Sequence, residues 1–207
     1  LIENIDILAA MRSPQNFIYD LMDAPELILQ KVAEIDDVYF QYFDAFHDLV
    51  RFGGGNSYTA FNIWGSGRTA KVQCDICALL SPDQFRTFVV PSLRKQCSRL
   101  DHSLYHLDGP DAIKHVPALM EMAELDALQW TCGAGQPDGA NDRWLPIYDQ
   151  VHAAGKSLWV MLYDGEASDW LAGAQKLIKR YGAGNLYFNF PIMSEAEGAM
   201  ILRALRS

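Results

Sequence analysis

The sequence lacks long apolar runs and an excess of basic charge. No stretch approaches the roughly 20 apolar residues that a membrane-spanning helix needs, and the first residues do not follow the basic-then-apolar order of a signal peptide. Lysine and arginine number 17 against 26 acidic residues, which gives a net charge of −9. Because nucleic acids and anionic membranes are polyanions, this balance argues against both as partners.

Cysteines and nucleotide-binding motifs are also scarce. Four cysteines in 207 residues do not form a disulfide framework, so we expect reduced thiols in a cytoplasmic protein. No predicted strand leads through G-x-G-x-x-G into a helix, and no Walker sequence is present. The glycines at 53–55 follow a predicted helix, which indicates a linker and not a phosphate cradle.

The composition is that of a folded domain. Half of the residues are apolar, 12% are aromatic and 21% are charged, which excludes a disordered chain. The length suits one domain spanning residues 1–207. The chain opens on Leu1 instead of methionine and enters an apolar stretch at once, so we expect an N-terminally incomplete domain.

The pattern of apolar residues predicts alternating helices and strands. A long helix should begin at Pro25, with Asp23 as its cap, and end before Gly53. Extended segments are expected at 58–64 and 71–75. Ser81 opens a capping box for a helix that Pro91 should bend. Further strands are expected at 103–107, 125–130, 158–163 and 186–190, and helices at 110–122, 144–154, 167–181 and from 194.

This alternation predicts an α/β fold with a parallel sheet. A doubly wound sheet and a (β/α)8 barrel of the TIM type both fit the alternation, and the missing dinucleotide motif favours the barrel. About five β/α units can be counted where a barrel has eight. We therefore expect the C-terminal five or so units of a longer barrel. An open sheet of this kind would have unpaired edges, which favours a homodimer, a departure from closure or a longer gene product.

Barrel enzymes place their chemistry at the carboxyl ends of the strands. The side chains expected there to bind substrate are Gln73, Trp130, Tyr163, Asp164 and Asn189.

His106 and Asp108 form the sharpest pattern, because a two-residue period places both on one face of a strand. They are our candidate catalytic residues, as a metal-binding pair or as an acid/base pair. The alternative is a structural histidine, with Asp108 capping the helix that begins at Pro110. Asp75 and Cys132, at neighbouring strand ends, are candidate further ligands for a metal such as zinc. Cys74-x-x-Cys77 could be a redox or metal motif, although packing of two buried thiols is the commoner explanation.

Three segments together resemble a known family. They are S-P-D-Q-F-R-T-F-V-V-P-S-L-R, then Y-H-L-D-G-P-D-A-I-K-H, and L-D-A-L-Q-W-T-C-G-A-G-Q-P. In this order and spacing they resemble the uroporphyrinogen decarboxylase superfamily, and within it the proteins grouped with corrinoid-dependent methyltransferases. The similarity runs over roughly residues 16–205.

The resemblance implies a barrel whose site lies in its mouth. In the methyltransferases an H-x-C pair and a later cysteine hold a zinc ion, which activates a thiol to receive a methyl group from a corrinoid protein. His106 matches the histidine, whereas Asp108 stands at the cysteine and Asn189-Phe190-Pro191 at the later one. A carboxylate is a harder ligand than a thiolate, which puts zinc activation in doubt.

The leading expectation is methyl transfer linked to a corrinoid protein or a small methylated substrate. The alternatives are decarboxylation of uroporphyrinogen in porphyrin biosynthesis and a non-catalytic barrel that binds a corrinoid or a partner. The family's decarboxylases bind their polycarboxylate substrate through N-terminal arginines that this sequence lacks, and its acidic balance suits that substrate poorly.

Overall fold

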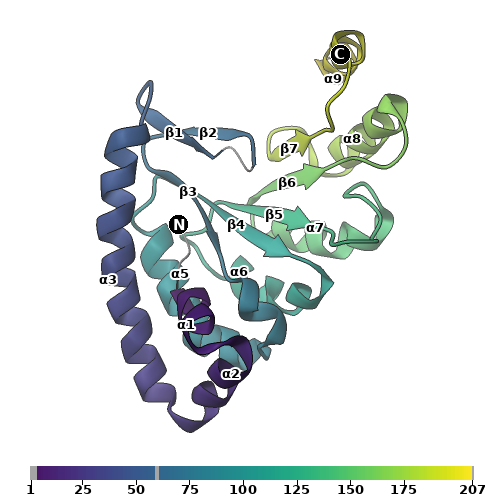
Figure 1. Ribbon diagram of the computed structural model, residues 1–207. Coiled ribbons are helices and arrows are strands. Elements are labelled where there is room, and N and C mark those ends of the chain that lie inside the picture. Colours follow the sequence, from purple (N-terminus) through teal and green to yellow (C-terminus); the bar gives the residue numbers. More distant parts are fainter. Residues whose placement is uncertain (1–3, 59–60, 207) are drawn as a thin grey trace.

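The computed structural model describes residues 4–58 and 61–206, and it shows an α/β fold built on one parallel sheet (Figure 1). The strands are β3 (Thr69–Gln73), β4 (His102–Asp108), β5 (Ala127–Thr131), β6 (Ser157–Met161) and β7 (Leu186–Asn189), each beside the next in the chain. The predicted parallel sheet is therefore confirmed. Within the described residues the sheet stays open, with β3 and β7 at its two edges.

Helices cover one face of this sheet and create the core. They are α4 (Pro82–Gln84), α5 (Val90–Cys97), α6 (Val116–Met120), α7 (Leu145–Ala153) and α8 (Ala167–Tyr181), with 3₁₀ turns at Asp75–Leu79, Pro110–His115 and Asp142–Trp144. The strands turn Val72, Leu107, Leu128 and Val160 into the core, where all four are fully buried. Burying each such side chain stabilises the fold by about 1.5–3 kcal/mol. The alternate residues of each strand therefore lie on the opposite face.

Three helices follow one another over residues 4–50. They are α1 (Asn4–Arg12), α2 (Pro14–Asp23) and the predicted long helix, α3 (Pro25–Val50). The prediction that Asp23 caps α3 is wrong, because Asp23 is the last residue of α2 and Ala24 occupies the cap without a side-chain bond. The α1 helix is joined to the sheet by Asn4, whose Nδ2 donates to the carbonyl oxygen of Gln73 at 2.7 Å.

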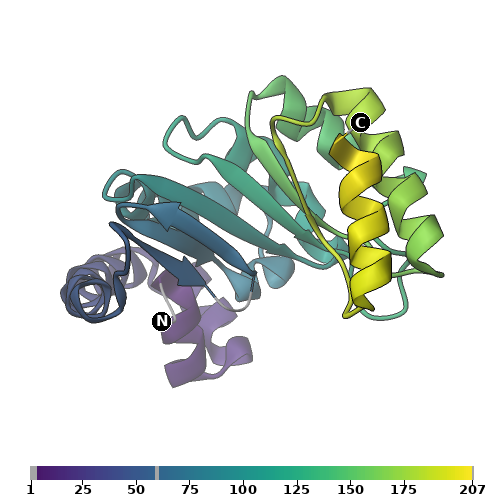
Figure 2. The ribbon, with the colours of Figure 1, turned by 90° about the horizontal axis from the view of Figure 1, so that it is seen from above.

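The expected strand at 58–64 is not continuous: Tyr58 ends one strand of a hairpin, and Ile63 and Trp64 begin the other. β1 (Gly55–Tyr58) pairs antiparallel with β2 (Ile63–Ser66), and residues 59–60 lie outside the described part. Asn62 adopts a φ of 53°, a left-handed conformation that asparagine tolerates and that interrupts a strand. Asn56 anchors the hairpin beside β3, since it exchanges two hydrogen bonds with the backbone of Thr69 (Figures 1 and 2).

The helical segment that contains Pro91 begins as predicted and changes geometry before the proline. Ser81 and Gln84 form the expected capping box. A π-helical turn spans Phe85–Val89, and α5 then starts at Val90. Because proline has no N–H to donate, a widened turn just before it lets the chain continue as a helix.

The C-terminal helix, α9 (Glu195–Arg206), follows β7 and contacts α8 at the far edge of the sheet (Figures 1 and 2). Among the described helices, none has the length and apolar character required to cross a membrane.

His115 makes the stability of the core depend on pH. Its ring is fully buried and stacks on Phe85 at 4.2 Å between centroids, and its Nε2 donates to the carbonyl oxygen of Cys77 at 2.8 Å. Burial lowers the pKa of this imidazole. Below the ordinary histidine pKa of about 6.5 the unfolded chain therefore binds the proton more readily than the folded one, so acid weakens the fold.

We expect the free energy of unfolding to fall as the pH drops below about 6.5, because protons bind this histidine more readily in the unfolded chain. Urea titrations of wild type and His115→Gln at several pH values measure the effect. The variant retains a donor for Cys77 but cannot titrate, so its stability should depend less steeply on pH. Equal slopes for the two proteins would contradict the assignment.

Candidate functional site

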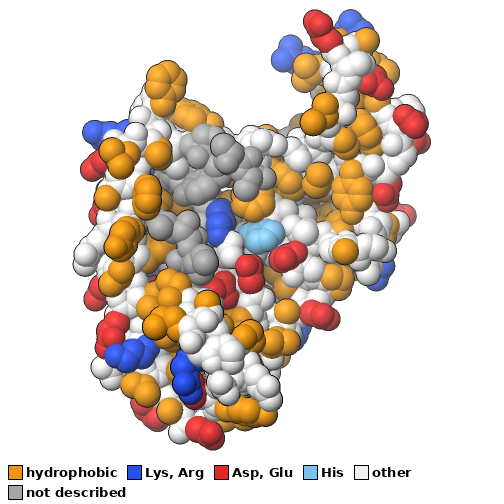
Figure 3. Space-filling view, in the orientation of Figure 1, with side chains coloured by type: hydrophobic (Ala, Val, Ile, Leu, Met, Phe, Trp, Pro, Cys, Tyr) orange, Lys and Arg blue, Asp and Glu red, His pale blue; other side chains and the backbone are white. Residues whose placement is uncertain are grey.

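A row of side chains crosses the sheet on the face opposite the core. The strand register aligns Gln73 with His106, His106 with Gln129, Gln129 with Trp159 and Trp159 with Tyr187. Figure 3 shows this side of the molecule, with a hollowed centre where a histidine lies near a basic side chain and several acidic ones. We define the open face as this side of the sheet.

His106 is held in one orientation by the neighbouring strand. Its Nδ1 bonds to Oε1 of Gln129, and Nε2 of Gln129 donates to Oγ1 of Thr131 at 3.0 Å. Since an amide oxygen only accepts, Nδ1 is the donor, and in the neutral ring Nε2 keeps its lone pair. The ring of Phe61, from the hairpin turn, lies 5.3 Å from the imidazole and shields it on one side.

Acidic side chains gather beside this histidine, at the carboxyl end of β3. Lys71 donates to Oε1 of Gln73, and Nε2 of Gln73 donates to Oδ2 of Asp75 at 2.8 Å. Asp6 accepts from the backbone N–H groups of Asp75 and Ile76. Burial raises the pKa of Asp6, and the nearby Asp75 carboxylate adds to the rise, while the two N–H bonds oppose it. Asp6, Gln73 and Asp75 line a cavity of about 420 Å³.

Four of the sequence-predicted residues lie on the open face: Gln73, His106, Asp108 and Asn189. Asp108 is exposed. The hydrogen-bond partner of the His106 imidazole is Gln129, a position for which we had considered Asp108. Asp108 is not the helix cap either, because Gly109 occupies that position without a side-chain bond. Asn189 accepts a hydrogen bond from Asn62 at 3.0 Å, which joins the hairpin turn to β7.

The other three predicted substrate-binding residues lie away from this row. Trp130 is only 1% exposed and packs edge-on against Trp144 in the core, with 4.9 Å between ring centroids. Asp164 accepts from the backbone N–H of Asp138, and the hydroxyl of Tyr163 donates to the carbonyl oxygen of Gln136. These two residues organise the loop that follows β5.

The predicted metal ligands are not gathered into one site. Cys132 is buried and two-residue alternation places it with Trp130, whereas His106 and Asp108 lie on the open face. Burial raises the pKa of the Cys132 thiol to about 12, which disfavours the thiolate that binds zinc. Among the described residues no three His, Cys, Asp or Glu side chains are placed to hold a metal ion. These residues do not fit the zinc site that the family resemblance implies.

Cys74 and Cys77 are likewise buried, and burial raises the pKa of Cys74 well above its ordinary value. Their thiols are part of the core packing, as the commoner of our two explanations expects.

Sequence reasoning missed three residues of the site: Asp6, Phe61 and Gln129. Gln129 carried a usable signal, because it is a buried polar residue inside an apolar strand and shares the two-residue period of Thr131. Asp6 and Phe61 come from segments that reach the site only through tertiary contacts, so no local pattern marks them.

Comparison with known proteins adds no relative. No protein-family model, curated protein or solved structure matches this chain.

Proposed function

We propose that this chain carries the substrate face of a methyl-transfer enzyme similar to the uroporphyrinogen decarboxylase superfamily, with His106 as its general base. The observation that carries the proposal is the fixed imidazole: Gln129 holds Nδ1 and no described residue bonds to Nε2, so Nε2 of the neutral ring can accept a proton.

The sheet supports the barrel component of this proposal. Its strands follow the chain order from β3 to β7, and the core side chains lie on one face while polar ones lie on the other. In a doubly wound sheet the strand order reverses at a switch point and helices cover both faces. We therefore propose that the five strands are consecutive units of a (β/α)8 barrel, with the open face as its interior.

The chemistry assigned to His106 needs no metal. Nε2 takes the proton of a thiol acceptor, and the resulting thiolate attacks the methyl carbon. The bond from that carbon to its donor breaks, and the electron pair stays on the donor. The donor is a methyl-corrinoid carried by a partner protein. Phe61 limits the access of water to the imidazole, because its ring lies against it.

The charge of the site disfavours porphyrinogen decarboxylation. Asp6 and Asp75 line the cavity beside the sheet, and Asp108 stands exposed at the end of β4. A substrate with many carboxylates would be repelled there. A thiol acceptor meets no such repulsion.

The test uses methylcobalamin as donor and 2-mercaptoethanol as acceptor. We expect the wild-type chain to produce the methyl thioether, measured by mass spectrometry, faster than the protein-free mixture. His106→Gln should lower the enzymatic rate about 100-fold, the loss typical of removing a general base.

His152→Gln is the matched control, because His152 is an exposed histidine on α7. It should retain the wild-type rate. Methyl-transfer function is wrong if wild type adds nothing to the protein-free rate. The assignment of His106 alone is wrong if the His106→Gln and His152→Gln rates are equal.

A further inference from the structure

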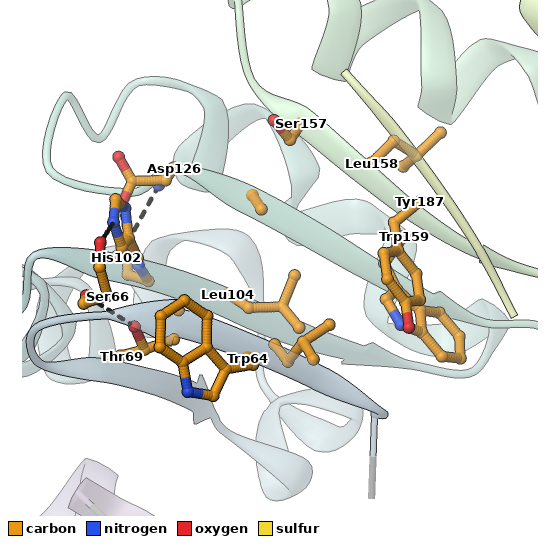
Figure 4. Close-up of a pocket in the computed structure, with 14 residues that line it drawn as sticks. Trp64, Ser66, Thr69, His102, Leu104, Asp126, Ser157, Leu158, Trp159 and Tyr187 are labelled. Carbon is orange, nitrogen blue, oxygen red and sulfur yellow. Dashed lines mark hydrogen bonds between the residues drawn. The ribbon is translucent and has the colours of Figure 1, made fainter. Parts of the chain in front are cut away.

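A second cavity lies at the other end of the open face, where the strands begin. It has a volume of about 420 Å³, and its floor is formed by Leu104 and Ala127. Figure 4 shows His102 and Asp126 at one end of this groove, Trp159 and Tyr187 at the other, and Trp64 between them. The proposed methyl-transfer chemistry uses none of these side chains.

Two aromatic rings of the groove, those of Trp159 and Tyr187, are held by hydrogen bonds. Nε1 of Trp159 donates to the carbonyl oxygen of Phe61 at 2.9 Å, and the hydroxyl of Tyr187 donates to that of Asn62. The Trp159 and Tyr187 rings stack at 6.2 Å with 10° between their planes. Trp64 is 55% exposed, so one of its faces is open to a ligand. The fixed rings of Trp159 and Tyr187 offer apolar surface without the entropy cost of ordering them.

The polar end of the groove carries a carboxylate with one unused oxygen. Oδ2 of Asp126 accepts from the backbone N–H and the hydroxyl of Ser103, at 2.8 and 3.0 Å. No described residue donates to Oδ1. An N–H donor on a bound molecule can fill that position, and a positive charge on the donor strengthens the bond.

We propose that this groove binds a planar aromatic cation that carries N–H donors. Its ring stacks on Trp64 above the aliphatic floor, and its charged N–H group bonds to Asp126. Cations are favoured by the faces of tryptophan and tyrosine as well as by the carboxylate. The net charge of −9 also attracts cations at long range.

Isothermal titration calorimetry with 2-naphthamidine at about pH 8 tests the proposal, because this ring system is planar, cationic and ends in N–H donors. Its neutral counterpart, 2-naphthamide, has nearly the same shape. We expect the wild-type chain to bind the amidine at least tenfold more tightly than the amide. Trp64→Ala should weaken amidine binding about tenfold, the combined value of stacking and cation–π contact.

Asp126→Asn keeps an oxygen for Ser103 and should reduce the preference for the amidine over the amide several-fold, leaving the part that the aromatic faces supply. Tyr42→Ala is the matched control, since Tyr42 is an exposed aromatic residue on α3, and it should bind like wild type. Circular dichroism establishes that each variant is folded. The proposal is overturned if wild type does not prefer the amidine, or if Trp64→Ala and Tyr42→Ala bind it equally well.

Discussion

Replacing Trp130 by alanine is expected to lower the free energy of unfolding by about 3–5 kcal/mol, the usual cost of truncating a buried tryptophan. The side chain is 1% exposed and packs against Trp144 beneath β5. Removing it leaves a cavity between the sheet and α7 that the surrounding core cannot fill by relaxing. Urea denaturation followed by far-UV circular dichroism measures this loss.

Trp64→Ala is the matched control, because Trp64 is a half-exposed tryptophan of the hairpin. It should cost less than about 1 kcal/mol, as most exposed substitutions do. The pair also decides between the two roles considered for Trp130. A Trp130→Ala chain as stable as Trp64→Ala would contradict a core position and return Trp130 to the list of substrate-binding candidates.

The order of elements could be predicted from sequence because it depends on local patterns. The 3.6-residue and two-residue periods identified α3, α8 and the five parallel strands. The hairpin was missed because β1 and β2 are four residues each, too short to show a period. The π-helical turn before Pro91 was missed because its geometry depends on packing around the proline. The spacing of apolar residues gives no information about that packing.

For the site, the sequence could predict only which residues of one strand share a face. Alternation placed His106 and Asp108 on one face, which the register of β4 bears out. It could not reveal which face helices would cover, so Trp130 and Cys132 were grouped with residues of the open face. Nor could it reveal Gln129 as the partner of His106, because cross-strand pairs depend on register.

Asp138 anchors the loop that joins β5 to the 3₁₀ turn before α7. Oδ1 accepts from the backbone N–H of Ala140 at 2.9 Å, and Oδ2 accepts from those of Tyr163 and Asp164 at 2.9 and 3.2 Å. One buried carboxylate therefore joins the loop after β5 to the residues that follow β6. The sequence predicted only a polar loop here, with Tyr163 and Asp164 as binding residues.

Asp138→Ala is expected to lower the free energy of unfolding by about 3 kcal/mol, because it leaves three backbone donors without their charged acceptor. It should also expose residues 132–141 to protease. Asp138→Asn retains one acceptor oxygen and should lose roughly half as much. Asp142→Ala is the matched control, since it removes only an exposed ion pair with Lys176 and should cost less than about 1 kcal/mol. Limited proteolysis of the three variants under native conditions separates the effects. If Asp138→Ala is cut no faster than Asp142→Ala, the carboxylate does not hold this loop. Other contacts must then keep Tyr163 and Asp164 in place.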